Sequence, residues 1–117
     1  SNPKTCERCV IEKVNQLLFF DNLALYYVLR EIPPVVLARA FLTVDSRLSG
    51  SLLGLMDPEQ RTMVHALMIK ENDEDTEKND QSAHALIDMA NELIKKGIIR
   101  KEGPHFRGVQ AAEESQG

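Results

Sequence analysis

Proline residues divide the middle of this chain into short segments, and this division constrains the fold more than any other feature. Pro34 directly follows Pro33. A residue before proline is biased away from the helical conformation, so any preceding helix must end by Ile32. Pro58 follows Asp57 and opens another segment, since proline suits the first turn of a helix. The chain around these prolines is therefore expected to form short helices joined by tight turns.

Apolar residues on both sides of the prolines recur every three or four positions, which favours helices over strands. After Pro34, for example, Leu37, Ala40, Phe41 and Val44 would lie on one helical face. Similar patterns predict a series of amphipathic helices of this kind along the chain. They are expected at about residues 5–20, 22–32, 34–44, 46–55, from 58 onward, and 82–96.

Several polar residues have the positions of helix caps. Asp57 can accept the N–H of Gln60, and Gln60 can reach back as in a capping box. Asp21 or Asn22, and Asp45 or Ser46, can begin two other helices. Gly97 follows the last apolar pattern and can adopt the left-handed conformation that ends a helix. Local signals thus place most of the expected helix ends.

The region from Glu71 to Asp80 carries six acidic residues and one basic residue, Lys78. It lacks the glycine and the alternating ligand order of a calcium-binding loop, so we expect a solvated loop or a frayed helix start. Beyond Gly103 and Pro104 the chain is polar and is expected to be disordered, whereas Ile98 and Ile99 are expected to fold back as an apolar clip.

These observations predict an all-α fold, an armadillo-like stack of short antiparallel helices with a long C-terminal helix. The expected divisions are a tag remnant at residues 1–4, one helical domain at 5–101 and a disordered tail at 102–117. The chain has no initiating methionine, so it is expected to begin within a longer protein. It has no apolar run long enough for a transmembrane helix or a signal peptide, and no direct membrane insertion is expected.

Composition argues against two functional classes. The chain has 14 basic and 18 acidic side chains, a net charge of −4, and no dense basic run, which argues against nucleic-acid binding. No pair of titratable residues has the spacing for acid–base catalysis, so no enzyme activity and no cofactor are expected. The three histidines, His65, His84 and His105, lack paired spacing. His65 and His84 are each expected one residue outside the apolar stripe of their helix, at its boundary.

Cys6 and Cys9 have the spacing of half a zinc site or of a redox pair. Zinc would need two further ligands, and no residues with suitable spacing supply them. A redox pair would need a strand before it, in a thioredoxin-like setting. The preferred interpretation is that both cysteines face a neighbouring helix, and no metal site is predicted.

Two segments resemble the C-terminal domain of the flagellar motor switch protein FliG. Residues 29–38, LREIPPVVLA, and residues 52–57, LLGLMD, are similar to that family's "LLREV", "LxxALKG" and "FLxNMSxRA" motifs. If Met56 is aligned with the methionine of "NMS", residues 92–97, ELIKKG, coincide with the family's terminal helix without a gap. The resemblance covers residues from about 22 to 99.

This resemblance implies a non-enzymatic part of the flagellar rotor, located in the cytoplasm at the base of the flagellum. It implies other rotor subunits, FliM-like and FliG-like, as partners, and possible contact with the cytoplasmic loop of the stator protein MotA. It also allows a homodimer that exchanges helices.

The family's charged torque-generating positions are replaced here. Its lysine coincides with Leu42, its arginines with Glu59 and Asp75, and one of its acidic residues with Leu67. Weak or absent stator coupling is therefore expected through the usual residues. Nearby basic residues are expected to form an alternative face. The predicted partner-binding residues are Arg39, Leu42, Arg47, Glu59, Arg61, Leu67, Lys70 and Asp75.

Three alternatives remain open. Residues 34–38, PVVLA, also resemble the helical "PxxxA" pattern of the acidic cytosolic domain of MgtE-type magnesium channels. This resemblance would make the chain a regulatory domain of a transporter. Short helices with tight turns would also suit a helix-turn-helix nucleic-acid binder, against the acidic balance. A generic helical adaptor would need no further motif.

Overall fold

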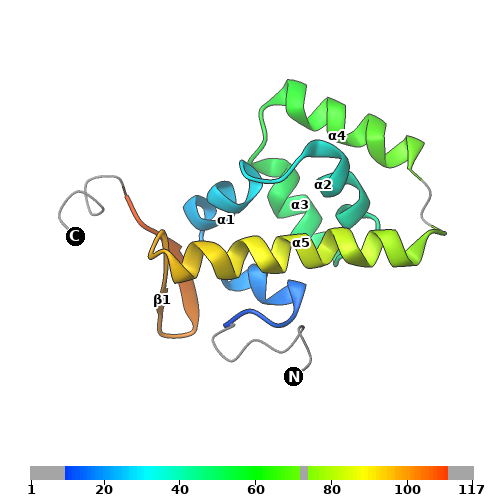
Figure 1. The fold of residues 1–117 in the computed structure, drawn as a ribbon. Helices are drawn as coiled ribbons and strands as arrows, with labels where there is room; N and C mark the ends of the chain where they lie inside the picture. Colours follow the sequence, from blue (N-terminus) through cyan, green and yellow to red (C-terminus); the bar gives the residue numbers. More distant parts are fainter. Residues whose placement is uncertain (1–9, 72–73, 111–117) are drawn as a thin grey trace.

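The computed structural model describes residues 10–71 and 74–110 and shows a mostly helical fold, as predicted (Figure 1). A two-stranded hairpin is the exception. The predictions for residues 1–4, for Cys6 and Cys9, and for the end of the tail lie outside the described residues. The elements are a 3₁₀ helix η1 (Val14–Phe19), α1 (Asn22–Leu29), α2 (Pro34–Phe41), α3 (Ser46–Gly54), α4 (Pro58–Lys70), α5 (Thr76–Lys95), β1 (Ile99–Glu102) and β2 (His105–Gly108).

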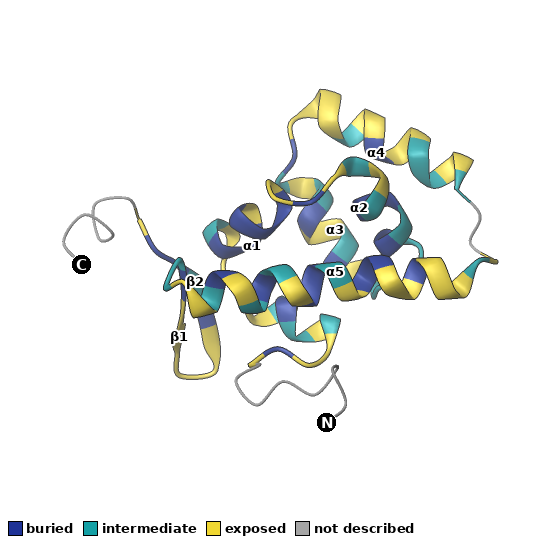
Figure 2. Ribbon diagram, in the orientation of Figure 1, coloured by how far each residue is buried: buried dark blue, intermediate teal, exposed yellow. Residues whose placement is uncertain are grey.

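The 20-residue helix α5 is the element around which the others pack. It lies chiefly against α2 and also contacts α1, η1 and β1 (Figure 1). Its dark, buried side faces the shorter helices in Figure 2. The core is aliphatic, with Leu86 of α5 fully buried among residues such as Leu37 and Val28. The predicted long C-terminal helix is thus confirmed.

Aspartates begin four of the α-helices. Asp21 accepts the Ala24 N–H at 2.8 Å, and Asp57 accepts the Gln60 N–H at 2.8 Å. Asp45 caps α3 in the same way, and all three caps agree with the sequence. The fourth is Asp75, which accepts the Lys78 N–H at 3.3 Å and was not predicted. Such caps satisfy N–H groups that have no partner within the helix.

The end of α5 has the predicted glycine cap. Gly97 has φ +77°, in the left-handed region that glycine adopts at little cost. The Ile98 N–H donates to the Leu93 carbonyl at 2.9 Å, and the Gly97 N–H donates to the Ile94 carbonyl at 3.0 Å. These two hydrogen bonds form a Schellman motif, which reverses the chain into β1.

The start of α5 was predicted wrongly. The helix begins at Thr76, six residues before Ser82. Of the two alternatives for the acidic run, a solvated loop or a frayed helix start, the structure has a helix start from Thr76, because carboxylates are favourable at the positive end of a helix. The cap at Asp75 and the acid Glu77 in the first turn supply that charge.

The first expected helix, at residues 5–20, is also shorter where it is described. Only Val14–Phe19 is helical, and residues 10–13 are not. Asn91 of α5 explains the difference. Its side-chain oxygen accepts the N–H groups of Val10 and Ile11 at 3.0 and 2.9 Å, and its amide donates to the Ile11 carbonyl at 2.8 Å. These bonds take up main-chain groups that a helix would use internally.

The expectation of disorder directly after Gly103 and Pro104 is wrong, because β2 pairs there with β1 in an antiparallel hairpin. Gly103, with φ +60°, supplies the turn. Phe106 is buried, and the Asp21 N–H donates to its carbonyl at 2.8 Å. A Cβ atom on Gly108 would lie 2.7 Å from Leu23, so only glycine fits at this approach to α1. The predicted apolar clip is confirmed at Ile99, which is 1% exposed.

Helix α4 is the least buried of the long helices. It packs chiefly on α2. Met63, Val64, Leu67 and Met68 were expected on its buried side, but only Val64 is buried. The yellow and teal colouring of α4 in Figure 2 shows how little of it the core covers.

Candidate protein-binding groove

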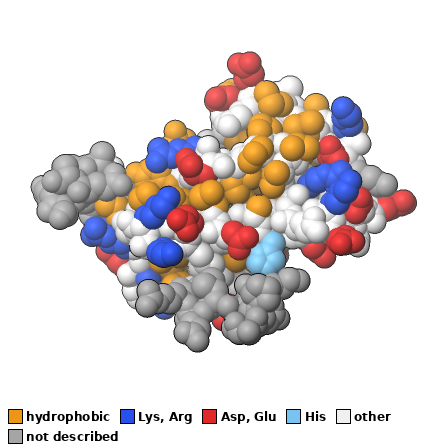
Figure 3. All heavy atoms as spheres, in the orientation of Figure 1, with side chains coloured by type: hydrophobic (Ala, Val, Ile, Leu, Met, Phe, Trp, Pro, Cys, Tyr) orange, Lys and Arg blue, Asp and Glu red, His pale blue; other side chains and the backbone are white. Residues whose placement is uncertain are grey.

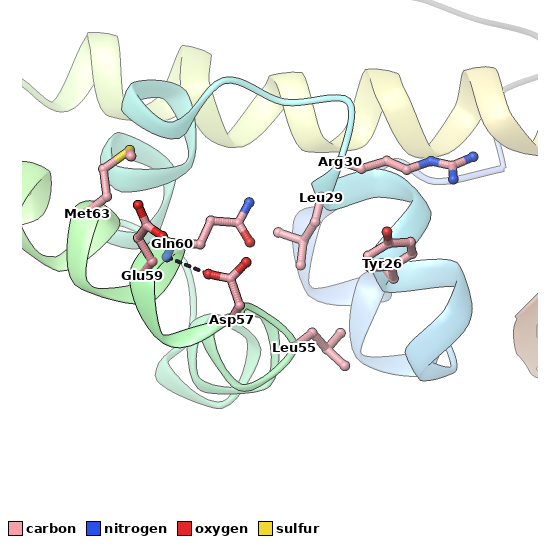
Figure 4. A pocket seen from close by; sticks show the side chains of 8 residues that line it. All are labelled: Tyr26, Leu29, Arg30, Leu55, Asp57, Glu59, Gln60 and Met63. Carbon is pink, nitrogen blue, oxygen red and sulfur yellow. Dashed lines mark hydrogen bonds between the residues drawn. The ribbon is translucent and has the colours of Figure 1, made fainter.

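A groove of about 520 Å³ separates α1 from the start of α4, and we call it the α1–α4 groove (Figure 4). Each of these helices has an aspartate cap at its N-terminus, Asp21 for α1 and Asp57 for α4. The caps set the residues at which the two helices begin. The groove is lined by Tyr26, Leu29 and Arg30 on the α1 side, and by Leu55, Asp57, Glu59, Gln60 and Met63 on the α4 side.

The walls of the groove combine apolar and polar side chains in similar amounts. Leu29 and Leu55 point into the space between the helices in Figure 4. Tyr26 is 48% exposed and Met63 is 47% exposed, which is high for large apolar side chains. Tyrosine and methionine in such positions are typical of protein-binding surfaces, because both offer a large contact area to a partner.

Charged residues line the rims of the groove. Asp57 is committed to the cap of α4, whereas Glu59 in the first turn is exposed. On the other rim, the Arg30 guanidinium lies 4.6 Å from the centre of the Tyr27 ring and 3.7 Å from the Glu31 carboxylate. The groove therefore places charged residues beside its apolar side chains, a combination that protein interfaces also show.

Glu59 is the one predicted partner-binding residue that lines this groove. Arg61 lies close by but bonds within the chain. Its Nε donates to the Leu53 carbonyl at 3.0 Å, and its Nη2 donates to the Met56 carbonyl at 2.9 Å. These two hydrogen bonds from Arg61 fix the angle between α3 and α4, which sets one wall of the groove. Leu67, another predicted residue, is half-buried against the core.

Arg39 joins three parts of the fold. Its Nη2 lies 2.5 Å from the Glu71 carboxylate, and its Nη1 donates to Asn79 Oδ1 at 3.4 Å. The Arg39 and Glu71 side chains are only 19% and 16% exposed. This half-buried network connects α2 to α5 and to the end of α4.

The remaining predicted residues lie at or next to helix ends. Arg47 donates two hydrogen bonds to the Asp45 side chain, at 3.1 and 3.0 Å. These bonds hold the pKa of Asp45 below its usual value and raise the pKa of Arg47. Leu42 caps the end of α2, Lys70 ends α4, and Asp75 caps α5. Of the eight predicted residues, only Glu59 lines the α1–α4 groove.

Sequence reasoning missed most of the groove, including Tyr26 and Met63. A signal was present in α4, where apolar residues occur on every side of the helix, from Met63 and Ala66 to Ile69. A helix that is apolar all round must bury more than one face. Ile69 is 87% exposed in this chain, so that burial is incomplete.

The described residues contain no group of three or more His, Cys, Asp or Glu side chains suited to a metal ion. His84 lies 3.6 Å from Asp88 on the exposed side of α5, and the His105 ring contacts the Phe19 ring edge-on. Within residues 10–71 and 74–110, no helix has both the length and the apolar character needed to cross a membrane.

Comparison with known proteins gives no relative. No protein-family model matches the chain, and neither a curated protein nor a solved structure matches it.

Proposed function

We propose that this chain is a non-enzymatic protein-interaction module, and that the α1–α4 groove is the surface that binds its partner. The observation that supports this proposal most is the pair of half-exposed apolar side chains, Tyr26 and Met63, on opposite walls of one groove. Exposed apolar groups that border a groove lose contact with water when a partner fills it, and this loss drives association.

The resemblance to the FliG family supplies the proposed setting. In that setting the helices form an armadillo-like stack, and the partners are FliM-like or FliG-like rotor subunits at the base of the flagellum. Stator contact would be weak, since Leu42, Glu59 and Asp75 stand at the family's charged positions. Binding would depend on shape and apolar contact, without bond chemistry.

The test compares two substitutions on the same helix. Met63→Lys places a charge in the groove, and Ile69→Lys places the same charge on α4 outside the residues that line the groove. Tagged wild type and both variants are used to recover partners from the native host, with quantification by mass spectrometry. We expect Met63→Lys to reduce recovery of the main partner at least tenfold, as for an interface hot spot. Ile69→Lys should retain it within about twofold.

Two results would contradict the proposal. If Ile69→Lys abolishes recovery and Met63→Lys does not, another face of α4 binds the partner. If the recovered partner is not a rotor protein, the groove assignment stands but the flagellar setting fails. Circular dichroism of both variants serves as the folding control, since both positions are exposed in the free chain.

A further inference from the structure

The hairpin end of the molecule carries a basic charge that the rest of the chain does not share. Residues 95–107 hold five basic side chains and one acidic side chain, a net charge of +4, in a chain whose net charge is −4. The remaining residues therefore carry −8. Figure 3 shows Lys and Arg side chains gathered towards the hairpin end, with Asp and Glu side chains densest at the opposite end.

The helix dipole explains only part of this charge. A dipole favours cations in the last turn of α5, where Lys95 lies. Arg100, Lys101 and Arg107 lie beyond that turn, in the hairpin. Their positions need another explanation.

The two arginines of the hairpin lie directly opposite each other. Arg100 pairs with Arg107 in the antiparallel register, and like charges in that position destabilise a sheet. Arg107 is compensated by an ion pair with Glu102. Arg100 is exposed and has no acidic partner among the described residues.

The two edges of the hairpin differ. On β2, the Phe106 carbonyl accepts the Asp21 N–H at 2.8 Å, and the Gly108 N–H donates to the Asp21 side chain at 3.0 Å. That edge is covered by the chain before α1. No third strand covers β1 in the described part of the chain, so β1 is an edge strand.

The outward main-chain groups of β1 follow from the register. The Val109 N–H donates to the Ile98 carbonyl at 2.9 Å. Hydrogen-bonded positions alternate in an antiparallel pair, so Arg100 faces β2 and Lys101 directs its N–H and carbonyl away from it. Lys101 is exposed, which leaves both groups accessible to another extended chain.

We propose that this outer edge of β1, with Arg100 and Lys101, binds an extended acidic segment of a partner protein as an additional strand. Main-chain hydrogen bonds to Lys101 align the segment, as in other cases of strand addition. The Arg100 guanidinium pairs with a carboxylate of the segment, with the two-point geometry that arginine favours.

Charge also selects the occupant. Basic residues on an edge strand discourage pairing with a second copy, which carries the same charges at the same edge. A long polyanion would extend past the four-residue strands onto a molecule whose other residues carry −8. A short acidic segment satisfies the basic residues without that repulsion.

The test uses defined peptides and does not involve the groove. A fluorescent nine-residue peptide that alternates Glu with Thr or Val is titrated with the chain, and binding is followed by anisotropy. The same peptide with Lys in place of Glu is the control. We expect only the acidic peptide to bind, with several-fold weaker binding when salt is raised from about 50 to about 300 mM.

Variants locate the binding site. Arg100→Glu and the milder Arg100→Gln should weaken acidic-peptide binding, by at least tenfold for Glu. Lys78→Glu changes the net charge as much as Arg100→Glu but lies at the other end of α5, and it should change binding by less than twofold. Amide hydrogen exchange should slow at Lys101 when the peptide is bound.

Three results would overturn the proposal. Equal binding of the Lys peptide would remove the role of charge. Unchanged exchange at Lys101 would show that no strand is added. Tighter binding of single-stranded RNA or of anionic lipid vesicles would assign the basic edge to a different class of partner.

Discussion

Helices α4 and α5 begin with similar local signals but have different places in the fold. Each starts after an aspartate cap with an acid in its first turn. Along its 20 residues α5 buries seven, including Leu86 and Ala90, whereas the 13-residue α4 buries only Val64. The cap sets where a helix begins, whereas packing against other elements determines how much of the helix is buried. In this chain α5 serves the core, and α4 presents a surface.

The largest effect should come from the core side of this comparison. Leu86→Ala removes a fully buried side chain from α5 and should cost about 2–5 kcal/mol of the free energy of unfolding. Ile69→Ala on α4 should change it by less than about 0.5 kcal/mol. Urea unfolding measures both. If Ile69→Ala costs as much as Leu86→Ala, then α4 belongs to the core and the comparison fails.

The second prediction concerns the network of Arg39, Glu71 and Asn79, which connects the end of α4 to α2 and α5. Arg39→Ala leaves the half-buried Glu71 and the buried Asn79 without this partner and should cost about 1–3 kcal/mol. A double-mutant cycle with Glu71→Gln isolates the pair. A coupling energy near zero would show that Arg39 does not anchor α4 through Glu71.

The caps offer a third prediction, at the level of local stability. Asp57→Ala and Asp75→Ala each remove a cap and should cost about 1 kcal/mol. Their effects on hydrogen exchange should differ. Loss of Asp57 should increase exchange along much of α4, since few contacts hold that helix, whereas loss of Asp75 should affect only the first turn of α5. If both variants increased hydrogen exchange over the same share of their helices, the inferred difference in packing between α4 and α5 would be contradicted.

The smallest effect should come from Asp45, which caps α3 and serves as a reference outside both helices. The hydrogen bonds from Arg47 lower the pKa of Asp45 in the folded state. The carboxylate therefore contributes stability above its unfolded pKa of about 3.8, and this contribution is lost as the pH falls through the lower folded value. The difference in unfolding free energy between wild type and Asp45→Asn should shrink as the pH falls below 3.8. A difference that does not change with pH would show that the hydrogen bonds to Arg47 do not couple to folding.

Local chemistry in the sequence predicted much of the fold. The caps at Asp21, Asp45 and Asp57 depend on a side chain and an N–H two or three residues away, so sequence alone identifies them. The same holds for Pro34 at the start of α2 and for Gly97 at the end of α5.

Contacts between distant residues could not be predicted in this way. Asn91 fixes Val10 and Ile11 from 81 and 80 positions away, which prevents a helix there. The hairpin depends on Asp21, which lies 87 positions before Gly108. The α1–α4 groove likewise combines Tyr26 with Met63, residues that only the folded chain brings to one surface.

The most direct test of the central claim replaces Met63 with a photoreactive amino acid and irradiates cells of the native host. A second protein with the same replacement at His84, on the exposed side of α5, is the control. We predict a discrete crosslinked product from position 63, absent from position 84, whose other component is the partner bound in the groove. Equal crosslinking from both positions, or none from position 63, would contradict the claim that α4 presents a binding surface.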